Sequence, residues 1–434
     1  MLEKKEIQYF PIFIFGLCSL LVARDVIGIS YNKFILVGFI LLFAIVSNYK
    51  DLSSMLCFMF PLTWGLPYTY IFLGCIIICW FKRKKIPGPS FILIIIFFLL
   101  EIVASFFYQT TDYISIIKYV SVIAIFFTFL YDSEIDKISC IKAYYYGSIV
   151  LCLIILVTTF RNAPSNWLYL FSKGWFRFGS KQAEDAEGMM LSVNSNTLAY
   201  YSIVGIAIAY YFIPGTKGKQ RWLHIFALGL FLISGVFTVS ISWMIVFAVC
   251  TLLFVFSQTK NVKAVLFSAL GMIVLLLVFR IAISNRPELL SAFTDRLANA
   301  DLRTGNNRTE LMLGYHRVFI NNPRFIFLGT GVTQYRQVTN LINSFHNMIQ
   351  QIFVSYGVFG GLIFFIGLLA PLRKIKKHTT TLLDWIPLIV VLLFTQTIQF
   401  INPESLMLPF VIAFYLLSAN SAKEEENETL YYNG

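Results

Sequence analysis

The chain has 434 residues, of which 58% are hydrophobic and 13% charged, and its mean hydropathy is +0.74. This balance excludes a soluble globular domain. The net charge of +12 would favour nucleic acid as a partner of a soluble protein, but most basic residues here flank apolar runs. Basic residues in that position are typical of loops beside membrane spans, so we reject nucleic acid as a partner.

Long apolar segments recur along almost the whole chain and predict a helical membrane protein with many spans. The sequence contains fourteen of them, near 9–23, 34–47, 52–64, 67–81, 89–108, 114–131, 140–160, 191–213, 223–239, 241–258, 264–283, 346–370, 384–401 and 405–419. The third and fourth are short and are separated by Gly65 and Pro67, so we expect about twelve to fourteen spans. The predicted fold class is all-α, a polytopic transmembrane bundle with a long, partly helical outer loop.

Lysine-rich clusters between the spans indicate the orientation. If all fourteen segments cross the membrane, three clusters fall on the same side of it: Lys82, Arg83, Lys84 and Lys85; Lys217, Lys219 and Arg221; Arg373, Lys374, Lys376 and Lys377. The positive-inside rule assigns this side to the cytoplasm, and both termini with it. The first apolar segment follows Lys4 and Lys5 but has no cleavage site, so we interpret it as an uncleaved span of a cytoplasmic-membrane protein.

This orientation divides the chain into four parts. They are the spans of 1–283 with a smaller outer loop at 161–190, a large extracytoplasmic loop at 284–345, the C-terminal spans of 346–419 and a cytoplasmic tail at 420–434. Within the spans, Glu101 and Lys118 lie at similar depths on consecutive antiparallel segments. We predict that they form an ion pair, because pairing relieves the cost of burying either charge alone.

The smaller outer loop carries Arg161, Arg177 and Gly179. Its aromatic residues are most simply an interfacial belt, with stacking on sugars as the alternative. The acidic residues at 184–187 favour a solvated turn over a divalent cation site, so we expect no metal.

The large outer loop is the most informative part of the sequence. It contains seven arginines and no lysine: Arg286, Arg296, Arg303, Arg308, Arg317, Arg324 and Arg336. A guanidinium is always ionised and grips phosphate with two parallel hydrogen bonds. The loop therefore indicates a docking site for a phosphorylated substrate, with pairing to lipid headgroups as the alternative.

Two helices are expected inside this loop. The first covers 287–300. The second begins after a capping box formed by Asn307 and Glu310 and ends before Pro323. Arg308 then lies in the first turn of the second helix, where free N–H groups and the helix dipole also favour an anion. An ordinary solvated arginine is the alternative.

The last part of the loop leads back into the membrane. Residues 329–331 predict a flexible glycine turn that lets the loop move over a substrate. Ser344 is the expected N-cap of the next span, so His346 lies in its first turn, where the dipole favours a neutral ring able to accept a proton. A purely structural histidine is the alternative. Polar residues continue into the span below it: Asn347, Gln350, Gln351 and Ser355.

In this order, the motifs between residues 175 and 372 resemble the O-antigen ligase and polymerase family of bacterial envelope proteins. The matching residues are Arg177 and Gly179; Asn194, Ser195 and Asn196 for an Asn-Pro-Asn element; Arg308, Asn322 and Pro323; Gly329 and Gly331; His346 and Asn347; and Gly357, Gly360 and Gly361. The sequence departs from the family in two places. Ser195 replaces a proline, and a Ser-Arg element between two spans reads Ser240, Ile241, Ser242 and Trp243, which removes one phosphate contact unless Arg177 or Arg280 replaces it.

The resemblance implies a glycosyltransferase that polymerises undecaprenyl-diphosphate-linked repeat units into an O-antigen, capsule or exopolysaccharide at the outer face of the cytoplasmic membrane. It implies His346 and Arg308 as catalytic residues, with His346 as the base. The residues expected to bind the substrate are Arg177, Arg280, Arg303, Arg317, Asn194, Asn196 and Asn347. No cofactor is expected. The expected partners are the lipid-linked oligosaccharide, membrane lipids, a chain-length regulator and a flippase.

Three other functions stay open. An O-antigen ligase would transfer the glycan to a lipid A core sugar, and the sequence separates this activity poorly from polymerisation. A flippase or exporter of lipid-linked oligosaccharides would place its basic residues along a central cavity and would not need His346. A non-catalytic envelope partner would tolerate the loss of every residue named above.

Overall fold

The computed structural model describes most of the chain, namely residues 9–83, 87–109, 113–172, 176–179, 191, 193–258, 308–339, 346–375, 380–401 and 407–419. These residues form helices and connecting segments with no β-strand among them. Within them, seven helices are long and apolar enough to cross a membrane, and three shorter apolar helices accompany them. The predicted all-α, polytopic membrane fold is confirmed.

Thirteen of the fourteen apolar segments coincide with helices, and the segment at 264–283 lies outside the described residues. The helices of the N-terminal half are α1 (Tyr9–Leu21), α2 (Lys33–Val46), α3 (Tyr49–Met59), α4 (Tyr68–Arg83), α5 (Gly88–Phe107), α6 (Tyr113–Tyr131), α7 (Lys137–Arg161) and α8 (Trp167–Ser172). Those that follow are α9 (Ser195–Phe212), α10 (Gly218–Phe237), α11 (Ile241–Gln258), α14 (Arg308–Asn321), α15 (Pro323–Leu328), α16 (Tyr335–Thr339), α17 (Met348–Leu369), α18 (Leu382–Phe394) and Leu408–Ala419. The expected loop helix at 287–300 and the tail at 420–434 also lie outside the described residues.

Short polar side chains determine where several helices begin. Asn32, Asn48 and Asp136 each accept a hydrogen bond from a backbone N–H in the first turn of α2, α3 and α7. Thr381 and Asp384 form a reciprocal capping box at the start of α18. These caps bond N–H groups that have no partner within the helix, and such groups are costly near a membrane.

One end of the bundle, called the basic end here, carries the lysine-rich clusters. Arg83 pairs with Asp132 at 2.6 Å, directly before α7 begins. The first turns of α7, α10 and α18 line one cavity of about 480 Å³ at this end. The last turns of α17 join them, since the Tyr131 hydroxyl donates to the Gly367 carbonyl at 2.7 Å. The described residues of all three clusters therefore lie at the same end, as the sequence predicted.

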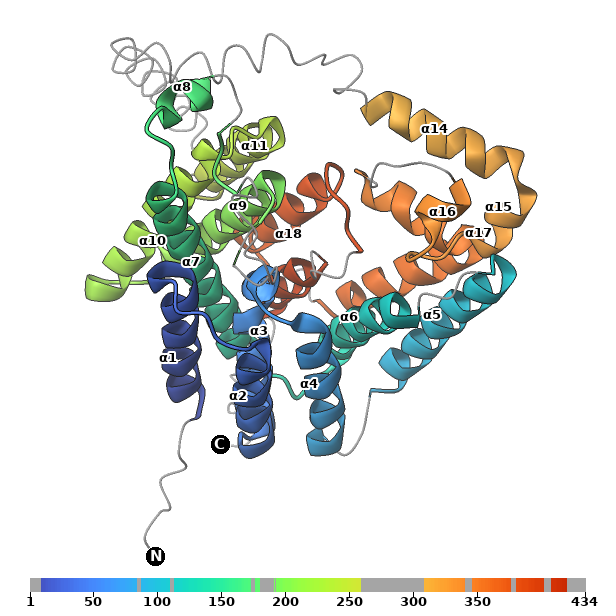
Figure 1. Ribbon diagram of the computed structural model, residues 1–434, viewed down its shortest axis with the longest axis horizontal. Helices are drawn as coiled ribbons and strands as arrows, with labels where there is room; N and C mark the ends of the chain where they lie inside the picture. Colours follow the sequence, from blue (N-terminus) through green and yellow to red (C-terminus); the bar gives the residue numbers. More distant parts are fainter. Residues whose placement is uncertain are drawn as a thin grey trace, which may run out of the picture.

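Helix α9 is central and almost entirely buried between α7, α10, α11 and α18. It runs antiparallel to α18, because Tyr200 stacks on Phe394 at a centroid distance of 5.3 Å while Tyr211 and Asp384 share the cavity at the basic end. Figure 1 shows α14–α17 gathered beside α5 on one side and α7–α11 on the other, with α18 between them. The end opposite the basic end, where α9 and α17 begin, is called the polar end.

A buried carboxylate holds the last part of the long loop to the bundle. Glu101 of α5 is fully buried, and it accepts hydrogen bonds from the Val332 backbone N–H (2.8 Å) and the Thr333 hydroxyl (3.3 Å). The predicted pair with Lys118 is wrong, since no ion pair among the described residues joins them. The physical reason is that donors from the loop already occupy the carboxylate.

The glycine turn at 329–331 is docked rather than flexible, in contrast to the expectation. The backbone N–H groups of Thr330 and Gly331 donate to the carbonyls of Val354 and Ser355 in α17, at 2.9 and 2.8 Å. The whole turn is buried. Residues 329–333 of the long loop are therefore hydrogen-bonded to two membrane helices, α5 and α17.

We expect Glu101→Leu to destabilise the protein by about 1–3 kcal/mol, because the Val332 N–H would be buried without an acceptor. Glu101→Gln keeps an acceptor and should cost less. The double variant Glu101→Lys, Lys118→Glu should not restore stability, because the lysine ammonium at position 101 is a donor and would face the Val332 N–H, which is also a donor. Thermal unfolding of the purified protein in detergent measures these differences, and rescue by the double exchange would contradict the assignment.

Gly357 interrupts α17 with a φ of +67°, and an added Cβ would lie 2.4 Å from the Phe327 carbonyl oxygen. We expect Gly357→Ala to cost at least about 1–3 kcal/mol, since only glycine adopts this conformation readily. Gly38→Ala in α2 is the matched control, because its Cβ would meet no atom within 4 Å. The same unfolding assay should show a loss for Gly357→Ala alone; equal stability of the two variants would contradict this reading.

Candidate functional site

The Arg177–Gly179 element lies on the first turn of α9. The Phe178 N–H donates to the Phe237 carbonyl at the end of α10 (3.1 Å), and the two rings stack at 4.8 Å. Gly179 has a φ of +75° and comes so close to α9 that a Cβ would lie 3.2 Å from the Ser195 Cα. Two parts of the predicted motif are thus brought together, although fourteen residues separate Gly179 from Asn194.

Arg177 is half-buried in this position. Burial lowers the pKa of its guanidinium from the ordinary value. Arginine nevertheless stays ionised at neutral pH, because its ordinary pKa is above 12. A guanidinium partly withdrawn from water attracts an anion more strongly than an exposed one.

The two asparagines of this motif have different surroundings. The Asn194 side chain accepts the Asn196 backbone N–H at 2.8 Å and so caps α9. Asn196 accepts from the Ser240 hydroxyl at 3.4 Å, which connects the start of α9 with the segment between α10 and α11. Ser240 is therefore in contact with the motif, and Arg177 lies beside that motif.

A buried ion pair positions the segment before α9. Arg24 and Asp25 lie in a π-helical turn, Val22–Ile27, and are joined by contacts of 2.6 and 2.8 Å. Arg24 also donates to the Gly65 carbonyl (2.8 Å), and Asp25 accepts from the Leu191 N–H (3.4 Å). Because both charges are buried and paired, they fix the segment to the end of α1. The sequence analysis missed this pair, whose only signal is two adjacent opposite charges after an apolar run.

The second half of the candidate site is the start of α17. Asn347 caps the helix by accepting the Gln350 N–H (2.9 Å), and its Nδ2 donates to Gln396 Oε1 (3.0 Å). The prediction of Ser344 as the N-cap is wrong, because Asn347 takes that role. His346 consequently precedes the cap instead of lying in the first helical turn. Its ring is half-buried with Nδ1 out of contact with solvent.

The polar stripe below His346 connects α17 to the segment after α18. The Gln351 side chain accepts from the Phe400 and Ile401 N–H groups (2.8 and 2.9 Å) and donates to the Ile401 carbonyl (2.5 Å). The Met348 N–H donates to the Thr395 carbonyl at 3.0 Å. These residues therefore hold the backbone around His346.

Packing of α9 against α18 brings the two halves together. Asn196 lies one turn before Tyr200 on the same helix face, and Tyr200 stacks on Phe394. Gln396 follows Phe394 by two residues and bonds Asn347. The residues that lie at the polar end in this way are called the polar cluster: Arg177, Asn196, Ser240, His346, Asn347 and Gln396.

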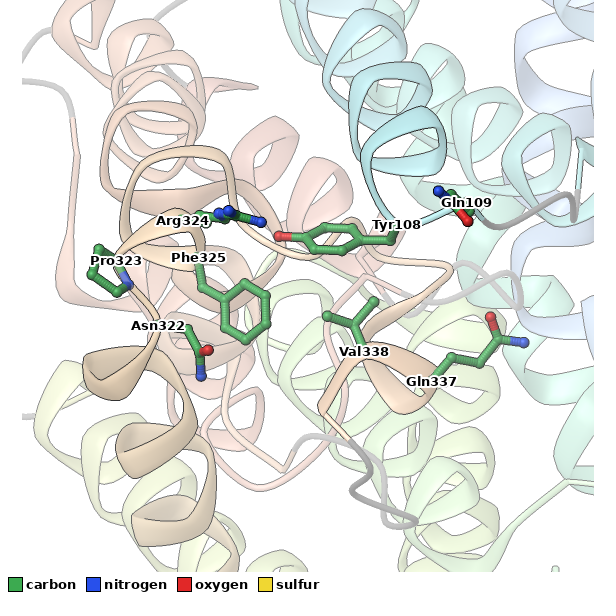
Figure 2. A pocket seen from close by; sticks show the side chains of 8 residues that line it. All are labelled: Tyr108, Gln109, Asn322, Pro323, Arg324, Phe325, Gln337 and Val338. Atoms are coloured by element: carbon green, nitrogen blue, oxygen red, sulfur yellow. The ribbon is translucent and has the colours of Figure 1, made fainter.

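The arginines of the long loop are described only in part. Arg308 opens α14, as the capping box predicted, but its side chain lies outside what the structure describes. Arg317 is exposed on the same helix, and Arg280 and Arg303 lie outside the described residues. Arg324 lines a pocket of about 610 Å³ together with Tyr108, shown in Figure 2. The sequence analysis gave Arg324 no separate role.

Among the described residues, no three histidine, cysteine or acidic side chains gather to hold a metal ion; the acidic turn at 184–187 lies outside them. Comparisons with protein-family models, with curated proteins and with solved structures find no match to this chain. The assignment of function therefore depends on the residues and their geometry.

We expect Asn347→Ala to lower stability by about 2 kcal/mol, since it removes both a helix cap and the hydrogen bond to Gln396. Asn347→Asp keeps the cap and should lose less. Asn32→Ala removes only a cap, at the start of α2, and serves as the control with an expected loss of about 1 kcal/mol. Thermal unfolding in detergent compares the three variants, and equal losses for both alanine variants would contradict a role for Asn347 beyond capping.

Proposed function

We propose that this protein is a membrane glycosyltransferase that polymerises undecaprenyl-diphosphate-linked oligosaccharide repeat units. The observation that supports the proposal is the polar cluster itself. Arg177 and Asn196 are separated from His346 and Asn347 by about 150 residues of sequence, yet the packing of α9 on α18 places them at one end of the bundle. They are the residues on which the resemblance to the ligase and polymerase family depends.

The proposed reaction transfers a glycan between two lipid-linked units. An acceptor hydroxyl oxygen attacks the anomeric carbon of the donor and forms the new glycosidic bond. The bond from that carbon to the diphosphate oxygen breaks, and undecaprenyl diphosphate leaves with the electron pair. His346 takes the proton of the acceptor hydroxyl. Attack opposite the leaving group inverts the anomeric carbon.

Arginines take the place of a metal in this proposal. Arg177 is the half-buried guanidinium of the cluster, and Arg308, Arg317, Arg280 and Arg303 are the further candidates for binding the diphosphate. Preorganised positive groups at the leaving oxygen stabilise the charge that develops in the transition state. The amides of Asn194, Asn196 and Asn347 would bind sugar hydroxyls with the hydrogen-bonding capacity that capping leaves to them.

The proposed orientation follows from the two ends of the bundle. The lysine-rich basic end faces the cytoplasm by the positive-inside rule, with both termini on that side. The polar end then faces outward from the cytoplasmic membrane, where lipid-linked repeat units are polymerised. Membrane lipids surround the bundle, and a flippase and a chain-length regulator are further candidate partners of this activity.

The test is the banding of surface polysaccharide on a gel, in a strain lacking the gene and complemented with variants. We expect His346→Ala, Arg308→Ala and Arg177→Ala to reduce long chains about 100-fold or more and to leave single repeat units. Arg221→Ala, an exposed arginine at the basic end, should restore normal banding. Immunoblotting of membranes shows that each variant is present.

Other outcomes would identify the alternatives. Long chains that stay on the lipid carrier and never reach the lipid A core would indicate a ligase. Normal banding from the His346 and arginine variants would contradict the assigned site and favour an exporter or a non-catalytic partner.

A further inference from the structure

A pocket of about 610 Å³ opens where the end of α5 meets the junction of α14 with α15 and the short helix α16. Figure 2 shows the rings of Tyr108 and Phe325 in its centre, with Arg324 and Asn322 on one side and Gln109 and Gln337 on the other. Its volume falls within the range of about 300–1,000 Å³ that small-molecule sites have. None of these six residues belongs to the polar cluster.

The aromatic part of the pocket is held in place. The rings of Tyr108 and Phe325 meet edge to face at 5.7 Å. The Tyr108 hydroxyl donates to the Gly329 carbonyl at 3.0 Å, in the turn that docks on α17. Burial raises the pKa of Tyr108, so this hydroxyl stays a donor at neutral pH. The pocket therefore presents fixed aromatic surface, which suits the apolar C–H face of a sugar ring.

The polar part is built from amides and one cation. Gln109, Asn322 and Gln337 are exposed around the aromatic rings, and each carries both donors and an acceptor. Arg324 is exposed as well, and none of the ion pairs among the described residues involves it. Amides match neutral hydroxyls, whereas a planar guanidinium matches a carboxylate through two parallel hydrogen bonds.

Backbone strain is present at the same place. Gln109 has a φ of +52°, and Val239 is the other residue besides glycine with a positive φ among the described residues. This conformation is uncommon for a residue with a side chain, and such strain gathers at functional sites. It turns the chain after α5 so that the Gln109 amide lies at the edge of the pocket, as Figure 2 shows.

The pocket lies toward the polar end, as the start of α17 does. Tyr108 is seven residues beyond Glu101 in the direction of the polar end, and Met348 is seven residues before Ser355 in the same direction. Glu101 and Ser355 bond neighbouring residues of one docked segment, Val332 and Gly331. The backbones of Tyr108 and Met348 therefore both lie toward the polar end from this anchor, each by about 10 Å of helix.

We propose that this pocket is a subsite for a carboxylate-bearing sugar, such as a uronic acid unit of the glycan. The inference rests on the proposed function for its role, which is to hold the chain beside the polar cluster while the next unit is joined. A sugar ring packs against Tyr108 and Phe325, its hydroxyls bond the surrounding amides, and its carboxylate pairs with Arg324. The one cation that the described residues supply to the pocket matches the single charge of a carboxylate.

The test is saturation-transfer NMR on the full chain in nanodiscs of zwitterionic lipid, with D-glucuronate, D-glucose and inorganic phosphate as probes at matched ionic strength. We expect glucuronate to bind about tenfold more tightly than glucose, and Arg324→Gln to remove that difference. Arg221→Gln is the matched control and should leave it unchanged. Gln109→Gly keeps the left-handed backbone without strain, so it should weaken glucuronate binding severalfold with no loss of thermal stability.

Three results would overturn the proposal. They are equal binding of glucuronate and glucose, an unchanged preference in Arg324→Gln, and displacement of glucuronate by an equal concentration of phosphate, which would indicate an anion or headgroup site. The assay measures binding without turnover. If the polysaccharide banding contradicts the proposed function while the preference for glucuronate is lost in Arg324→Gln, the sugar site stands and its role changes.

Discussion

The docking of residues 329–333, near the end of the long loop, depends on one buried carboxylate. Glu101 lies inside an apolar helix, where an ionisable group is tolerated only when its hydrogen bonds are satisfied. The Val332 N–H and the Thr333 hydroxyl satisfy it, so the segment that contains them is bound to α5. The same segment bonds α17 through Thr330 and Gly331. A loop that its composition marks as polar therefore ends as a fixed part of the membrane bundle.

The sequence predicted the helices well and the contacts between them poorly. Long apolar runs and the Asn307–Glu310 pair are local signals, and they located the spans and the start of α14 at Arg308. The partner of Glu101 is not a local property. Lys118 was chosen as the opposite charge at a similar depth on the next segment, whereas the actual donors lie 231 and 232 residues away and one is a backbone group, which no residue type marks. Helices α15 and α16 were missed because segments of six and five residues are too short to show periodicity.

The candidate site shows the same division. Polar residues at span starts were found because they interrupt apolar sequence, and Asn194, Asn196, His346 and Asn347 all lie at helix starts in the structure. Their detailed roles were not predictable, because a polar residue in that position first serves the helix: Asn194 and Asn347 are caps. Gln396 and Ser240 became recognisable only when the packing of α9 on α18 placed them beside those residues.

The two kinds of arginine at the polar end differ in a way that bears on the proposed reaction. Arg177 is half-buried and precedes Phe178, whose backbone bonds the end of α10, so the part of the chain that carries this positive charge is in place before a substrate arrives. Arg324 is exposed and lies beside a fixed aromatic surface. It takes part in none of the ion pairs among the described residues. A polymerase needs both properties, because it must stabilise a leaving diphosphate strongly and hold a growing chain weakly enough for release after each addition. A single exposed guanidinium gives weak, exchangeable binding, since water and salt screen it. Because the pocket is separate from the polar cluster, the cluster would bind the diphosphate tightly without slowing the release of the growing chain from the pocket.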